Sequence, residues 1–172
     1  MAIDKIQSES INLADTFAFT GTVTGAGDSS LFFQAYHSAS QSISAATTTK
    51  LNYPTELFDT GSKYDTSTSR YTPGVVGKYF VGATIRLTGS SISDSDARLY
   101  IKLNNANEGV VVGETTYSSA YYPMISANGI ANVTSTSDYF EVYHFQKTGN
   151  AATLAALAVD FPWSAFYGYK IG

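Results

Sequence analysis

Apolar and polar residues alternate along much of the chain, with the period of two that a half-buried β-strand requires. Residues 77–88 show the clearest alternation and residues 98–103 come next along the chain, so both predict strands inside a sheet. Shorter stretches, separated by residues that favour turns, cover residues 31–38, 48–58, 70–72, 110–116, 121–133, 139–146 and 166–171. The pattern predicts an all-β domain of about nine or ten strands.

A few segments interrupt or modify this pattern. The Ala- and Leu-rich run 151–158 fits a loop, a strand or one short helical turn. Gly82, inside the strand predicted at 77–88, predicts a bulge or the close approach of a neighbouring backbone. Residues 91–97 are rich in Ser and Asp and predict a hairpin tip. The absence of an internal repeat excludes solenoids and propellers.

Residues 1–27 differ from the rest and are predicted to form an extended N-terminal arm, which leaves residues 28–172 as the folded domain. Apolar residues of the arm fall at odd positions: Ile11, Leu13, Phe17, Phe19 and Val23. An extended chain would therefore carry them on one face, and that face would need another surface to cover it. We expect these five residues to bind a partner.

The composition indicates one domain that folds by packing alone. The 172 residues are 44% hydrophobic and include no cysteine, which excludes disulfides and thiolate metal sites. A formal net charge of -4, with only 10 Lys and Arg residues, argues against nucleic acid as a partner. No apolar run suits a secretion signal or a membrane span, so we expect synthesis in the cytoplasm and no membrane partner.

Four segments in order carry a family resemblance. Residues 57–80 contain Tyr64-Asp65, Tyr71-Thr72, Gly77 and Tyr79-Phe80, although Pro73 follows Thr72 directly. The others are residues 99–104, residues 138–143 with Ser137 in place of a glycine, and residues 164–171. With these segments, residues 31–172 resemble the globular-head domain of complement subcomponent q, a relative of tumour necrosis factor.

The resemblance implies a jelly-roll β-sandwich of ten strands that packs as a homotrimer around an aromatic axis. We interpret the aromatic residues of the matching segments as core or inter-subunit contacts, because tyrosine and phenylalanine are favoured in both places. They are Tyr71, Tyr79, Phe80, Tyr139, Tyr143, Phe166, Tyr167 and Tyr169.

The arm also resembles a known group: residues 2–23 are similar to the start of small virion proteins from tailed phages. This similarity implies a virion component on the capsid surface, made in the cytoplasm of the host cell. We predict a non-enzymatic capsid decoration or cement protein whose arm fastens the shell by binding the major capsid protein or another virion protein. The alternative is a head-fibre or tail-fibre tip that recognises a host surface glycan.

Candidate catalytic and metal-binding residues are few. His37 and His144 lie in no known catalytic motif. Asp94 and Asp96 have the alternating carboxylates of a calcium loop but lack a third acidic ligand, so we expect no cofactor, with calcium as the alternative. A hydrolase would need paired carboxylates, for which Asp59 with Asp65 or Asp138 with Glu141 are available. Nothing in the sequence brings either pair together.

Overall fold

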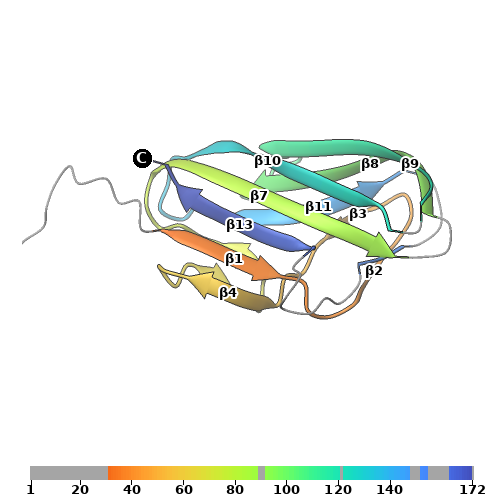
Figure 1. Ribbon diagram of the computed structural model, residues 1–172. Helices are drawn as coiled ribbons and strands as arrows, with labels where there is room; N and C mark the ends of the chain where they lie inside the picture. The colour runs from red at the N-terminus through yellow and green to blue at the C-terminus, as the bar shows by residue number, and fades with distance from the viewer. Residues whose placement is uncertain (1–30, 89–91, 121, 148–151, 155–162, 172) are drawn as a thin grey trace, which may run out of the picture.

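The computed structural model describes residues 31–88, 92–120, 122–147, 152–154 and 163–171. The regular structure in these ranges consists of β-strands in two antiparallel sheets that face each other (Figure 1). The prediction of an all-β domain is therefore confirmed. Within the same ranges, no apolar helix is long enough to traverse a bilayer.

The first sheet is built around its longest strand, β7 (Gly77–Thr88). Its order is β2 (Gln41–Ile43), β12 (Ala152–Leu154), β7, β13 (Ala165–Lys170), β1 (Phe32–Tyr36) and β4 (Thr55–Asp59). On its other side β7 pairs with β10 (Met124–Val133). Because β1 and β13 come from opposite ends of the described chain and pair with each other, this sheet closes the domain.

The second sheet has the order β5 (Tyr64–Asp65), β6 (Arg70–Tyr71), β11 (Phe140–Gln146), β8 (Ile92–Leu103) and β9 (Val111–Ala120). The short strand β3 (Thr48–Lys50) also pairs with β11. The chain passes repeatedly from one sheet to the other, as from β6 to β7, from β9 to β10 and from β11 to β12. Such connections are typical of jelly rolls.

Aromatic side chains from both sheets make up the centre of the core. Phe33 stacks on Tyr71 with ring centroids 4.0 Å apart and meets Phe166 edge-on at 4.9 Å. Tyr79 and Phe140 are fully buried beside them. The alternate residues of β7 point into this core, so the period of two in the sequence corresponds to burial on one face.

The strand boundaries depart from the sequence pattern in two regions. The single strand predicted at 48–58 is two strands, β3 and β4, which lie in different sheets. Buried Leu51 and Tyr53 cross between them, and Pro54 lacks the N–H that a continuous strand would donate. In the run 151–158, the described residues Ala152–Leu154 form strand β12. Strands β2 and β5, of three and two residues, are further strands that the pattern does not predict.

The prediction of a hairpin tip at 91–97 is wrong, because Ile92 to Ala97 belong to β8. Asp94 pairs with Tyr117 and Ala97 with Thr115 of β9, with irregular register between them. Pairing with β9 gives the backbone N–H and C=O groups of this strand hydrogen-bond partners whatever its side chains are. A polar segment at the end of a sheet can therefore continue a strand and need not form a turn.

We expect Phe33→Ala to lower the free energy of unfolding by about 3–5 kcal/mol, since it removes the ring that joins Tyr71 to Phe166. Urea denaturation followed by circular dichroism measures this change. The control Val76→Ala, at a side chain that is 51% exposed, should cost less than about 1 kcal/mol. A loss at Phe33 no larger than the control's would contradict this account of the core.

Candidate functional site

A line of apolar side chains crosses the outer face of the first sheet. Phe32 of β1 lies opposite Tyr169 of β13, Tyr169 opposite Phe80 of β7, and Phe80 opposite Ile130 of β10. We call these four residues the aromatic row. Three of them are well exposed, with Phe32 at 42%, Tyr169 at 47% and Ile130 at 63%. Exposed large apolar groups in one continuous line mark a surface that another molecule covers.

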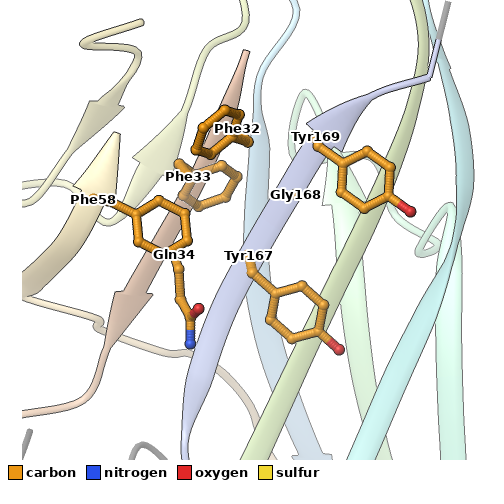
Figure 2. A pocket seen from close by; sticks show the side chains of 7 residues that line it. All are labelled: Phe32, Phe33, Gln34, Phe58, Tyr167, Gly168 and Tyr169. Carbon is orange, nitrogen blue, oxygen red and sulfur yellow. The ribbon is translucent and has the colours of Figure 1, made fainter. Parts of the chain in front are cut away.

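A groove of about 410 Å³ runs beside the aromatic row (Figure 2). Its lining comes from β4, β1 and β13 and consists of Phe32, Phe33, Gln34, Phe58, Tyr167, Gly168 and Tyr169. Phe58 and Phe32 meet edge-on with centroids 5.7 Å apart. The groove therefore extends the apolar surface toward the edge strand β4.

Gly82 of β7 shapes the same face. It lies opposite Tyr167, and a Cβ atom at Gly82 would come within 2.4 Å of the Tyr167 ring. The absence of a side chain lets this ring lie flat across β7, beside Phe80 at a centroid distance of 6.5 Å. The close approach predicted at Gly82 is thus made by a neighbouring side chain.

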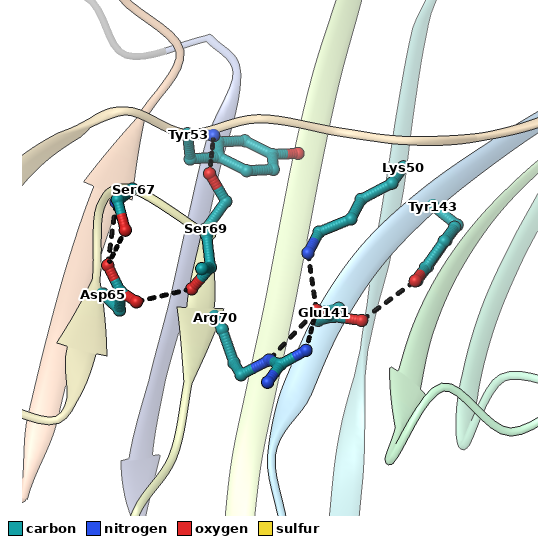
Figure 3. Close-up of polar contacts among 9 residues, drawn as sticks. Lys50, Tyr53, Asp65, Ser67, Ser69, Arg70, Glu141 and Tyr143 are labelled. Carbon is teal, nitrogen blue, oxygen red and sulfur yellow. Dashed lines mark hydrogen bonds and ion pairs between the residues drawn. The ribbon is translucent and has the colours of Figure 1, made fainter.

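The outer face of the second sheet carries charged groups around one buried carboxylate (Figure 3). Glu141 of β11 is only 2% exposed, and its Oε1 accepts hydrogen bonds from Lys50 Nζ at 2.5 Å and from Arg70 Nη2 at 2.9 Å. Its Oε2 accepts one from the Tyr143 hydroxyl at 2.9 Å. These contacts join β3, β6 and β11.

Tyrosine rings border these cations. The Arg70 guanidinium lies 3.7 Å from the centre of the Tyr139 ring. The Lys102 ammonium lies 4.7 Å from the Tyr143 ring and 5.9 Å from the Tyr100 ring. We call Lys50, Arg70 and Lys102, with Glu141 and these three tyrosines, the cationic band.

The protonation state of Glu141 depends on its partners. Burial alone would raise its pKa, but the hydrogen bonds from Lys50, Tyr143 and Arg70 outweigh burial, and the net effect lowers the pKa below the ordinary 4.5. Burial and the neighbouring Glu141 carboxylate raise the pKa of Tyr143, which therefore remains a hydrogen-bond donor at neutral pH. Glu141 is ionised there and holds the cations around it.

The other carboxylates considered for catalysis serve local turns. Asp59 accepts hydrogen bonds from the backbone N–H groups of Gly61, Lys63 and Tyr64. Asp65 accepts hydrogen bonds from the Ser67 and Thr68 side chains, which together with the Ser67 backbone lower its pKa to about 2.

Asp138 is held in the same way. It accepts hydrogen bonds from the Asn104 side chain and from the backbone N–H groups of Thr134 and Ser135, and these lower its pKa. All four carboxylates proposed for a hydrolase thus have structural partners.

The two histidines are buried and contact backbone carbonyls. His37 Nδ1 lies 2.5 Å from the Asn52 oxygen and its Nε2 lies 3.1 Å from the Leu154 oxygen. Burial lowers the pKa of His37 despite these contacts. His144 Nδ1 lies 2.9 Å from the Arg98 oxygen. Both rings join neighbouring segments of backbone.

The weak calcium prediction gains no support. Asp94 belongs to β8, and the Asp96 carboxylate pairs with the Arg98 guanidinium at 2.8 Å. Among the described residues, no three His, Asp or Glu side chains gather as metal ligands.

The predicted partner-binding and aromatic residues fall into four groups. Ile11, Leu13, Phe17, Phe19 and Val23 of the arm lie outside the described residues. Tyr71, Tyr79 and Phe166 are buried in the core. Phe80, Tyr167 and Tyr169 lie on the outer face of the first sheet, whereas Tyr139 and Tyr143 lie on that of the second.

Sequence reasoning missed Phe32, Phe58 and Ile130 on the apolar face. It also missed Lys50, Arg70 and Lys102 of the cationic band. The alternation of side chains along a strand could have indicated two of them, because it puts Phe32 and Ile130 on the face opposite their buried neighbours Phe33 and Ala131.

Solved structures share this arrangement of strands. The globular domain of zebrafish complement 1qA is 13% identical, with a TM-score of 0.58, and the match covers 83% of this chain and 98% of that one. The chain has the jelly-roll fold of complement-head and tumour-necrosis-factor-like domains. At this identity the likeness establishes the fold and leaves the function open.

Two further jelly rolls match equally well. Murine APRIL is 10% identical with a TM-score of 0.59, covering 82% of this chain and 98% of that one. The Eiger tumour necrosis factor of S. frugiperda is 12% identical with a TM-score of 0.59, covering 83% and 92%. No protein-family model and no curated protein matches the sequence.

We expect Glu141→Gln to lower the free energy of unfolding at neutral pH by about 1–3 kcal/mol, because Lys50 and Arg70 lose their counter-ion. Since the folded-state pKa of Glu141 is lowered, its stabilisation is present above the ordinary pKa of 4.5 and is lost as the pH falls below it. The variant should therefore lose less stability than the wild type on acidification.

Urea denaturation at neutral and acidic pH tests this expectation. The matched control is Glu108→Gln, which removes one exposed carboxylate. Equal stability of Glu141→Gln and Glu108→Gln at neutral pH would show that the Glu141 contacts contribute nothing.

Proposed function

We propose that this jelly roll is a non-catalytic homotrimer that serves as a structural part of a virion, as a capsid decoration or cement protein. The observation that supports self-association is the aromatic row. It sets apolar side chains in line across β1, β13, β7 and β10, over the groove that Phe58 and Tyr167 extend. Covering such a surface removes apolar area from water and stabilises the assembly.

The surroundings of the aromatic row favour a protein partner. The outward residues of β10 beside Ile130 are Ser126, Asn128 and Asn132, all polar and uncharged. Exposed Lys78 of β7 lies opposite Asn132 and is the charged member of this rim. An apolar centre with a largely uncharged polar rim resembles the core of a protein interface, where charged residues are depleted. A second and a third copy of this chain can supply the same kind of surface.

The virion setting rests on the similarity of residues 2–23 to the start of tailed-phage virion proteins. In the proposed assembly, Ile11, Leu13, Phe17, Phe19 and Val23 of each arm bind the major capsid protein or a neighbouring virion protein. Full burial of one such side chain contributes on the order of 1.5–3 kcal/mol, so five can offset much of the cost of ordering the arm.

A fibre tip that recognises a host glycan is the second candidate function. The cationic band favours it, because polar groups beside tyrosine rings are a suitable surface for sugars. Binding of the purified protein to virion shells that lack it, compared with adsorption to host cells, separates the two functions, since only a cement protein should bind the shells.

We expect Tyr169→Glu to dissociate the trimer, because it places a carboxylate from each copy in the apolar interface. Light scattering should give three times the 18.4 kDa protomer mass for the wild type and the protomer mass for the variant. Val76→Glu introduces the same charge at an exposed residue outside the row and should remain trimeric. A monomeric wild type, or a trimeric Tyr169→Glu, would refute this interface.

We expect deletion of residues 2–23 to leave a folded trimer that no longer binds virion shells. Co-sedimentation with shells that lack the protein measures binding, and light scattering measures the trimer. Full shell binding by the truncated chain would refute the role of the arm.

A further inference from the structure

We propose that the cationic band on the outer face of the second sheet binds an acidic saccharide, meaning a sugar that carries carboxylate, phosphate or sulfate groups. All of its residues belong to one protomer, and the face lies opposite the aromatic row. The inference therefore does not depend on the trimer and can fail or succeed separately from it.

The charges of the band are unbalanced. The band holds three cations, Lys50, Arg70 and Lys102, and one carboxylate, that of Glu141, which pairs with Lys50 and Arg70. Lys50 and Arg70 are 31% and 38% exposed, so they retain N–H groups that point to solvent. Because the whole chain has a net charge of -4, this local excess is not part of a general positive surface.

Of the three cations, Lys102 gives the strongest indication of an anionic ligand. It is only 9% exposed, and no carboxylate among the described residues forms an ion pair with its ammonium. Its cross-strand neighbour Glu141 directs its carboxylate away, toward Lys50 and Arg70. The Lys102 side chain is thus largely buried, while its ammonium lies beside the rings of Tyr100 and Tyr143 and can be stabilised further by an anionic ligand.

The tyrosines add a surface that suits a sugar ring. Tyr100 and Tyr143 lie directly opposite each other on β8 and β11, and both rings flank the Lys102 ammonium. Tyr100 also lines a hollow of about 360 Å³ with Asn107, Gly109 and Val112. Glu108, Glu114 and Arg98 complete that hollow.

These features specify the class of ligand. The acid group would lie at Lys102 and Arg70, a sugar ring on the tyrosines, and hydroxyl groups in the hollow, where carboxylate and amide side chains can accept and donate hydrogen bonds. The acidic Glu108 and Glu114 disfavour a long run of phosphates there, so nucleic acid is the weaker candidate.

Isothermal titration of the full chain with oligogalacturonate and with dextran sulfate tests the proposal. Neutral dextran and single-stranded DNA are the comparison ligands. We expect binding of at least one acidic saccharide, weakening with added salt, and no binding of dextran. Lys102→Gln should weaken binding about tenfold or more, because it removes a charge-assisted contact.

Lys147→Gln is the matched control. It removes the same charge from an exposed lysine at the end of β11, outside the band, and should change the affinity less than about twofold. Lys102→Arg keeps the charge and should retain most of the binding, which separates loss of the site from loss of the fold. Tyr169→Glu should bind the saccharide as the wild type does, whatever its oligomeric state.

Three results would overturn the proposal. The first is no binding of either acidic saccharide by the wild type. The second is equal weakening by Lys102→Gln and Lys147→Gln, which would show attraction by overall charge. The third is binding of single-stranded DNA as tight as that of the saccharides.

Discussion

The packing of Phe33 against Tyr71 and Phe166 fixes how the two sheets lie on each other, and both outer surfaces depend on it. Side chains of a strand alternate between its faces, so the residues chosen for the core determine those that face outward. In β7, a slip of one residue would bring Phe80 into the core and expose Tyr79. The aromatic row therefore exists because the core holds β7 in one register.

The two outer faces differ in the free energy required to remove them from water. The first sheet presents apolar rings framed mainly by uncharged residues such as Ser126 and Asn128, so covering the rings themselves buries few charges. The second presents three cations, Lys50, Arg70 and Lys102, with the single carboxylate of Glu141, and covering it without an anion would be unfavourable. This difference favours a protein partner on the first face and an anionic ligand on the second.

The likeness to complement-head and tumour-necrosis-factor-like domains persists at 13% identity or less in the matches described above. Few individual residues are needed for it, because strand alternation, turn residues and a core of the right volume suffice to specify a jelly roll. What the chain binds is decided by outward residues, which the fold leaves free to vary. The aromatic row, the groove and the cationic band, and not the fold, are therefore the features that bear on function.

The sequence by itself determined the all-β class and the extent of β7, because these follow from a period of two that acts within one strand. Only the structure divided the aromatic residues into buried ones such as Tyr71 and Tyr79 and outward ones such as Tyr169. Only the tertiary structure divided residues 48–58 between two sheets and placed 92–97 in β8. It alone aligned Phe32 with Ile130 and gathered the cationic band from four strands. Pairing between segments far apart in the chain depends on the register of whole strands, which local periodicity does not encode.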